Sequence, residues 1–320
     1  MKPPKFEYFA PSSLDEATAL LKQYGEEAKV LAGGQSLMPL LNMRLVRPAV
    51  IVDINRVHQL DYITETPGGG LAIGALTRQR TVERSVTAAE RCPLLVGALP
   101  FIGHFPIRNR GTVGGSIVHG DPAAELPAVS VTLEAEFVLA SSGNLRVVKA
   151  QDFFLAHLTT SLEPSEVLTE VRIPGLAHAP DSNKKWGWGF LEVCRREGDF
   201  AMVGASVLLQ LDENVDENDS CAAARVTMFG VAGTPQRMGR VEDMLVGRPV
   251  DRRTLEDVAK VVSEDINPFS DIHASAEYRK DVGGVLARRA VATALKRAKG
   301  HGPELALFPE RALFNEGANQ

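Results

Sequence analysis

Cysteine is scarce in this chain: its 320 residues include only three, Cys92, Cys194 and Cys221. An odd number of widely separated thiols provides neither a disulfide framework nor the paired spacing of a zinc site. An iron–sulfur cluster takes four thiolates, so these residues cannot hold one. We therefore expect a chain with no metal ligands and no cluster of its own, located in a reducing compartment, the cytoplasm.

Long apolar runs and several common catalytic motifs are also absent. No segment approaches the length of a membrane-spanning helix, and residues 1–6 lack the apolar stretch of a signal peptide. The dipeptide Gly-Lys does not occur, which excludes a P-loop, and no complete G-x-G-x-x-G, H-E-x-x-H or G-x-S-x-G is present. These absences disfavour a Rossmann site, a zinc peptidase and a serine hydrolase.

Basic charge is in deficit, whereas apolar residues are plentiful. The net charge of −5 and the pI of about 5.9 disfavour nucleic-acid binding, which selects basic surfaces. Hydrophobic residues make up 44% of the chain, enough for two or three domains with their own cores. A small anionic ligand held by local hydrogen-bond donors remains compatible with this composition.

Two short motifs could supply such donors, namely residues 32–36 (AGGQS) and 112–116 (TVGGS). Paired glycines let the backbone adopt conformations closed to other residues and bring N–H groups close to an anion, while the serine adds a hydroxyl. Each motif alone is more often an ordinary turn that follows a strand. Together, the two motifs could hold one pyrophosphate from both sides.

Periodicity predicts an α/β arrangement in the part of the chain that contains these motifs and an α+β arrangement in its last part. Ser13 and Glu16 form a capping-box pattern ahead of an apolar stripe that stops at Gly25. We expect further strands at 29–32, 49–54, 71–74 and 167–173, a helical stretch at 82–98 and a hairpin around 142–144. After a linker at 176–185 we expect strands at 188–194, 202–211 and 225–229, and helices from about 240 to 299.

These elements predict an N-terminal domain over residues 1–176, with subdomains of about 1–55 and 56–176. A C-terminal domain follows over 185–299, and a tail covers 300–320. Further motifs then identify a family: residues 107–112 (IRNRGT), 121–127 (DPAAELP), 190–201 (FLEVCRREGDFA), 276–280 (AEYRK) and 288–290 (RRA). With the two glycine motifs, they resemble the FAD-binding medium subunit of the molybdenum hydroxylases, over nearly the whole chain. That group includes carbon monoxide dehydrogenase and the flavin domain of xanthine dehydrogenase.

The resemblance implies a vanillyl-alcohol-oxidase-type FAD-binding fold of two α/β subdomains, followed by an α+β domain of the carbon monoxide dehydrogenase flavoprotein type. It implies no catalytic residue in this chain. By position in the family motifs, the residues that would bind FAD are Lys29, Val30, Leu31, Ala32, Gly33, Gly34, Gln35, Ser36, Leu37, Ile102, Thr112, Gly114, Gly115, Ser116, Glu125, Val167, Leu168 and Phe200.

Two positions depart from the family pattern. Phe200 stands where the aromatic residue near the isoalloxazine is often Tyr, and Leu191 stands where the xanthine dehydrogenase branch has Lys. Both departures favour the carbon monoxide dehydrogenase-like branch.

In function, the resemblance implies an oxidoreductase subunit whose FAD takes electrons from the [2Fe-2S] clusters of a small partner chain and passes them to an external acceptor. A large partner chain would carry the molybdopterin cofactor, in a dimer of heterotrimers. Two alternatives stay open: a free-standing FAD-dependent oxidoreductase of the same fold, and a cofactor-free scaffold. Residues 278–290 predict a helix whose apolar residues Tyr278, Val282, Val285 and Leu286 either contact another subunit or close the core of the C-terminal domain.

Overall fold

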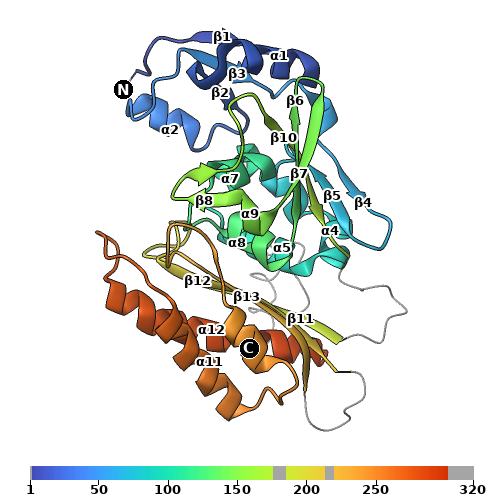
Figure 1. The fold of residues 1–320 in the computed structure, drawn as a ribbon, viewed down its shortest axis with the longest axis vertical. Coiled ribbons are helices and arrows are strands. Elements are labelled where there is room, and N and C mark those ends of the chain that lie inside the picture. Colours follow the sequence, from blue (N-terminus) through green and yellow to red (C-terminus); the bar gives the residue numbers. More distant parts are fainter. Residues whose placement is uncertain (1, 176–184, 213–219, 302–320) are drawn as a thin grey trace, which may run out of the picture.

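A computed structural model describes residues 2–175, 185–212 and 220–301 of the chain (Figure 1). Most of the expected linker and of the tail lies outside the described residues. The described chain forms three units, each built on its own sheet: the first unit (2–55), the second unit (56–175) and the third unit (185–301).

The first unit is a three-stranded parallel sheet in the order β1-β3-β2 with its helices alongside. Its elements are β1 (Glu7–Phe9), α1 (Leu14–Tyr24), a 3-10 turn (Gly25–Glu27), β2 (Ala28–Leu31), α2 (Leu37–Asn42) and β3 (Val50–Asp53). The N-cap part of the predicted capping box is confirmed, because the Ser13 hydroxyl accepts a hydrogen bond from the Glu16 N–H at 3.2 Å. The Glu16 carboxylate accepts in turn from the Ser12 N–H, one residue before the cap. Gly25 ends α1 with a φ of 51°, a conformation that favours glycine.

The second unit is a five-stranded antiparallel sheet in the order β4-β5-β10-β6-β7, packed against short helices. Its strands are β4 (Ile63–Glu65), β5 (Leu71–Gly74), β6 (Glu136–Ser141), β7 (Asn144–Lys149) and β10 (Val167–Ile173), with a small pair β8 (Phe154–Ala156) and β9 (Thr159–Thr160). Its helices are α3 (Gln79–Glu83), α4 (Val86–Arg91), α5 (Pro93–Ala98), α6 (Phe105–Arg110), α7 (Val113–His119), α8 (Glu125–Thr132) and α9 (Ala150–Phe153), with 3-10 turns at His58–Leu60 and Leu99–Phe101.

One helical stretch expected in this unit is instead divided into three helices. Ser85 caps α4 by accepting a hydrogen bond from the Ala88 N–H at 3.1 Å, so α3 has already ended. Pro93 starts α5, because it lacks the N–H that would continue α4. The predicted hairpin is confirmed, with Gly143 at a φ of 84° in its turn.

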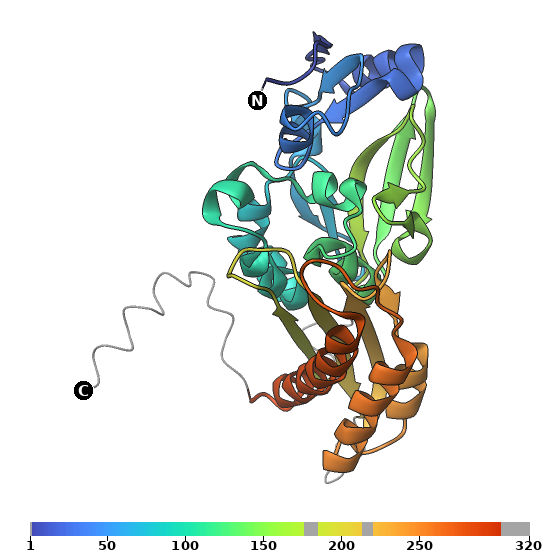
Figure 2. The same ribbon diagram turned by 90° about the vertical axis from the view of Figure 1, so that its left-hand side faces the viewer.

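The third unit is a four-stranded antiparallel sheet in the order β11-β12-β13-β14 with helices on one face (Figure 2). Its elements are β11 (Lys185–Val193), β12 (Val203–Leu211), β13 (Cys221–Phe229), β14 (Gln236–Arg237), α10 (Gly239–Leu245), α11 (Arg252–Asp265) and α12 (Ala276–Ala298). Gly187 and Gly189 let α12 lie close to the sheet, since a β-carbon at either residue would collide with the helix backbone. The opposite face of the sheet packs on the second unit.

The apolar face expected on α12 is only partly correct. Leu286 is buried and Val282 packs against the core of the third unit, which supports the core-closing alternative for these two residues. Tyr278 and Val285 remain exposed on the surface. The buried face of α12 instead includes Gly283, Leu286, Ala287, Ala290, Val291 and Ala294.

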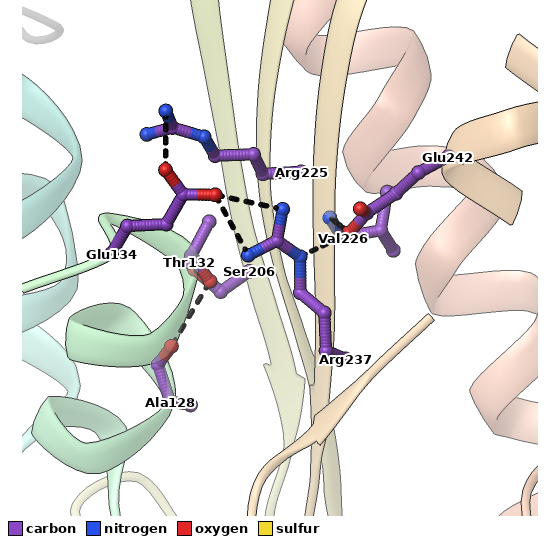
Figure 3. A network of polar contacts seen from close by, with 8 residues as sticks. All are labelled: Ala128, Thr132, Glu134, Ser206, Arg225, Val226, Arg237 and Glu242. Atoms are coloured by element: carbon purple, nitrogen blue, oxygen red, sulfur yellow. Dashed lines mark hydrogen bonds and ion pairs between the residues drawn. The ribbon is translucent and has the colours of Figure 1, made fainter. Parts of the chain in front are cut away.

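The contact between the second and third units, which we call the seam, has an apolar centre and a polar edge. At its centre the ring of Phe190 on β11 lies 5.1 Å from that of Phe101. At its edge the Thr132 hydroxyl donates to Ser206 at 2.9 Å. Beside them, the Glu134 carboxylate lies between the guanidinium groups of Arg225 and Arg237 (Figure 3). The third unit is thus fixed against the second by packing and by directional polar contacts.

Candidate cofactor-binding site

The first glycine motif follows β2 directly and borders a cleft of about 470 Å³. The cleft lies at the carboxyl ends of the parallel strands β2 and β3, the edge at which open α/β sheets bind ligands. Gly34 adopts a φ of 73°, a conformation that favours glycine. The cleft is lined by Leu31, Ala32, Gly33, Gly34, Gln35, Met38, Pro39, Asn42, Asp53, Asn55 and Arg110.

The backbone N–H groups of residues 33–36 are available to a ligand. None of them donates a hydrogen bond to any residue that the structure describes. The carbonyls nearby are occupied, since Gly34 accepts from the Met38 N–H at 3.1 Å and Gly33 accepts from the Gln35 side-chain amide at 3.0 Å. The motif therefore presents consecutive donors at the border of the cleft, an arrangement suited to an anion.

The second glycine motif does not form a loop or a turn after a strand. It forms the first turn of helix α7. The Thr112 hydroxyl caps this helix by accepting from the Gly115 N–H at 3.1 Å. The Gly114 N–H donates to the Ala75 carbonyl at 2.9 Å, and the Ser116 N–H donates to Thr112. A β-carbon at Gly114 would lie 2.5 Å from that of Ala75, so this glycine is required for close packing.

The two motifs nevertheless lie side by side. A β-carbon at Gly33 would lie 2.5 Å from the Arg110 carbonyl oxygen, just before the second motif. One at Gly115 would lie 3.8 Å from the β-carbon of Ala32. The absence of side chains at these two glycines lets the two segments approach each other closely.

A polar network that the motif analysis missed holds the first motif in place. The Asn55 amide donates to the Ala32 carbonyl at 2.7 Å, and Arg78 donates to the Asn55 oxygen at 2.8 Å and to the Arg110 carbonyl at 2.6 Å. Asp53 accepts from Asn55 and, at 2.6 Å, from the Tyr8 hydroxyl. The sequence signal that could have found this network is the position of residues 53–55, which lie at the C-terminal end of a buried parallel strand and just after it.

Charge around the cleft follows from the same contacts. Burial raises the pKa of Asp53, but hydrogen bonds from Tyr8 and Asn55 outweigh it and hold that pKa below its usual value. Burial and the neighbouring Arg110 lower the pKa of Arg78. Arg110 lines the cleft and Arg78 contacts its carbonyl, so two basic residues lie at this border.

Eight of the expected cofactor residues lie close to this cleft without lining it. They are Lys29 and Val30 on β2, Ser36 and Leu37 at the start of α2, and Thr112, Gly114, Gly115 and Ser116 at the start of α7.

Five further expected residues lie elsewhere. The side chains of Ile102 and Leu168 pack in the core of the second unit, and that of Val167 packs in the core of the first. Glu125 begins α8 and is 3% exposed, whereas Phe200 is 59% exposed on the loop between β11 and β12. The structure therefore gathers the glycine motifs at one cleft and leaves these five outside its lining.

Comparison with known proteins identifies the chain. Residues 4–176 match the family described as FAD binding domain in molybdopterin dehydrogenase, and residues 188–294 match the CO dehydrogenase flavoprotein C-terminal domain. The chain is 38% identical to the 6-hydroxypseudooxynicotine dehydrogenase complex subunit alpha of Paenarthrobacter nicotinovorans, over 93% of this chain and 97% of that one. It is 36% identical to the carbon monoxide dehydrogenase medium chain of Hydrogenophaga pseudoflava, over 93% and 99%.

Solved structures agree with these relatives. Carbon monoxide dehydrogenase from Hydrogenophaga pseudoflava superimposes with a TM-score of 0.86 at 36% identity, covering 93% of this chain and 99% of the other. Quinoline 2-oxidoreductase from Pseudomonas putida 86 gives 0.85 at 37% identity, with the same coverage. The fold and the site define an FAD-binding subunit of a molybdenum hydroxylase complex. Within that class, the chain belongs to the carbon monoxide dehydrogenase medium-chain family.

Proposed function

We propose that this chain binds FAD noncovalently, with the pyrophosphate against the N–H groups of residues 33–36. The observation that carries the proposal is the set of unpaired donors beside the cleft, next to a second motif that also lacks side chains. Arg78 and Arg110 would balance the phosphate charge. The described residues that line the cleft include no His or Cys to form a covalent link to the flavin.

The residues present fit FAD in steric terms as well. Gly33 has no room for a β-carbon because the Arg110 carbonyl lies there, so the backbones of the two segments pack closely at the border of the cleft. We propose that the Ser36 and Ser116 hydroxyls also contact the cofactor. We propose that Glu125 and Phe200 lie toward the flavin end of the cofactor, and that Lys29, Val30, Leu37, Ile102, Val167 and Leu168 support its binding. FAD supplies the redox chemistry when bound, while the chain binds and orients it.

We further propose that the electrons come from a small chain with [2Fe-2S] clusters and leave to an external acceptor. The relatives' names support a multi-subunit assembly, since they are a complex subunit and medium chains. The three cysteines of this chain cannot hold a cluster. A large chain would carry the molybdopterin cofactor and oxidise the substrate, in a dimer of heterotrimers.

A cytoplasmic location is part of the same proposal. All three cysteines are free, as is typical of a reducing compartment. No helix among the described residues is long and apolar enough to cross a membrane.

Size-exclusion chromatography of native extract, with flavin, iron and molybdenum measured in each fraction, tests this function. We expect the chain to elute with all three and to carry about one FAD. A chain that elutes as a free monomer, while substrate-dependent acceptor reduction elutes elsewhere without it, would contradict the assembly. Flavin that stays attached after acid denaturation would contradict noncovalent binding.

A further inference from the structure

Strand β11 turns an ionisable side chain toward the seam. Leu191 and Val193 pack against the core of the third unit, on the helix side of the sheet. Phe190 packs on Phe101 of the second unit, on the other side. Because neighbouring strand residues point to opposite faces, Glu192 faces the second unit together with Phe190. The family departure at Leu191 therefore lies inside the third unit, and the residue beside it lies at the seam.

A second carboxyl group, that of Glu125, lies on the opposite wall of the seam. Helix α8 runs along the sheet, and at its C-terminal end Thr132 bonds to Ser206 (Figure 3). Ser206 on β12 pairs with Phe190 on β11. Near its other end, the Pro122 carbonyl accepts from the Gly230 N–H at 2.8 Å. The residue before that glycine, Phe229, covers Gly204, the partner of Glu192 across the strands. Glu125 and Glu192 therefore lie at the same end of the seam.

The two carboxyl groups have few hydrogen-bond donors among the described residues, and the only donor to Glu125 is its own backbone N–H. Glu125 is 3% exposed and accepts no hydrogen bond from another described residue. The Oε2 atom of Glu192 is buried without a partner. An ionised carboxylate in such surroundings is costly, so at least one of two neighbouring carboxyl groups stays protonated.

The charges around the two groups point the same way. Burial raises the pKa of Glu125 to about 7, and the Asp121 charge adds to the shift, whereas the hydrogen bond from its own backbone N–H and the Arg108 charge oppose it. Burial, followed by the charge of Glu125, raises the pKa of Glu192 to about 8. Cys194 and Asp199 follow Glu192 in the chain, toward the exposed loop. The pKa of the Cys194 thiol is raised by burial and by the charges of Glu192, Asp199 and Glu125.

The seam lies within reach of a cofactor anchored at the cleft. Helix α7 starts beside the first glycine motif and ends at His119, just before Asp121 and Glu125. At about 1.5 Å per residue, this helix covers roughly 10 Å. An FAD whose pyrophosphate lies at residues 33–36 can therefore extend its flavin ring along α7 toward the two carboxyl groups.

We propose that Glu125 and Glu192 form a proton-holding pair that spans the seam and serves the bound flavin. This inference rests on the proposed function, in which iron–sulfur clusters deliver electrons without protons. Flavin that gains two electrons takes up at least one proton. The pair supplies that proton, as the O–H bond of Glu192 breaks and the carboxylate pair keeps the added negative charge. Water at the exposed residues 195–197 then returns a proton to the pair.

Three isosteric variants of the FAD-loaded complex test the pair: Glu125→Gln, Glu192→Gln and, as a matched control, Glu256→Gln on the exposed face of α11. Infrared difference spectra across pH 5 to 9 report the carbonyl band of a protonated carboxyl group, independent of activity. We expect a band that titrates at about pH 7 to 8 in the wild type and the control, and in Glu192→Gln a weaker band from Glu125 alone that titrates at about pH 7. In Glu125→Gln the band should titrate at lower pH, because the neighbouring charge is gone.

The midpoint potential of the flavin, measured against pH, provides the second measurement. We expect a change of slope near pH 7 to 8 in the wild type and the control, and a smaller change in each seam variant, where one carboxyl group of the pair remains. If FAD is bound but all four proteins give the same infrared band and the same plot, the pair is refuted while the FAD function stands. If the wild type binds no FAD, the proposed function fails, and the infrared titration still decides whether the pair shares a proton.

Discussion

The two glycine motifs look alike in sequence, yet the structure gives them different roles. In the first, the N–H groups of residues 33–36 have no partner among the described residues, and Gly34 has a φ of 73°. In the second, the N–H groups of residues 113–116 are all used to start α7 and to join it to Thr77 and Ala75. Paired glycines therefore indicate that something approaches the backbone closely. The surrounding hydrogen bonds decide whether that neighbour is a ligand or another part of the chain.

Gly34→Val gives the largest effect that this comparison predicts. Valine at a φ of 73° is strained by about 1 to 3 kcal/mol, and relief of that strain turns the N–H groups away from the cleft. We expect the variant to purify without FAD. Gly143→Val is the matched control, because it carries the same strain in a hairpin turn where a side chain meets nothing within 4 Å. Wild-type flavin content in Gly34→Val would show that the first motif is an ordinary turn.

Gly115→Ala should act on the helix more than on the cofactor. Its β-carbon would lie 2.6 Å from the Thr112 hydroxyl that caps α7. We expect thermal unfolding to show a loss of about 0.5 to 2 kcal/mol, the usual value of an N-cap, with FAD retained. Gly239→Ala in the first turn of α10, where the space is open, is the control. A complete loss of FAD from a stably folded Gly115→Ala would make the two motifs equivalent.

Asn55→Ala removes the support of the first motif without touching the second. The Asn55 side-chain N–H donates to the Ala32 carbonyl, and the Asn55 side-chain oxygen accepts from Arg78. The orientation of the N–H groups that follow Ala32 therefore depends on Asn55. We expect a loss of about 1.4 kcal/mol of binding free energy, which corresponds to roughly ten-fold weaker FAD binding. Titration of the FAD-free protein with FAD, followed by fluorescence, would measure it. Unchanged affinity would mean that the motif is held by its own turn.

Tyr8→Phe is the mildest change and adds a pH dependence. The pKa of Asp53 is held below its usual value, so its contribution is present at neutral pH and is lost as pH falls through that lowered pKa. Without the Tyr8 hydroxyl the pKa rises, and we expect FAD release on acidification to begin at higher pH. At neutral pH, the lost hydrogen bond at this exposed site should change binding by about 1 kcal/mol or less. Identical acid-release curves for the two proteins would contradict this role of Asp53.

Local signals in the sequence were enough for much of the fold. Strand β10 spans the expected residues, and α1 begins at its capping serine and ends at Gly25, because both features depend on neighbours in the chain. The first glycine motif was also found from its sequence alone. The family resemblance is confirmed by matches over both domains.

Long-range contacts account for what the sequence did not show. Asn55 reaches Ala32 and Arg78 reaches Arg110 only after the three parallel strands and the C-terminal end of α6 have come together. The packing of Gly114 on Ala75, which turns the second motif into a helix start, likewise depends on distant residues. No local pattern distinguishes a glycine that meets a phosphate from one that meets another part of the backbone.

Amide hydrogen exchange of the wild-type chain, with and without FAD, tests the central claim most directly. The free N–H groups of residues 33–36 should exchange fast without the cofactor and become protected when it binds. The N–H groups of residues 113–116, already bonded within the protein, should be slow in both states. Protection by FAD that appears at residues 113–116 and not at residues 33–36 would contradict the assignment of the pyrophosphate to the first motif.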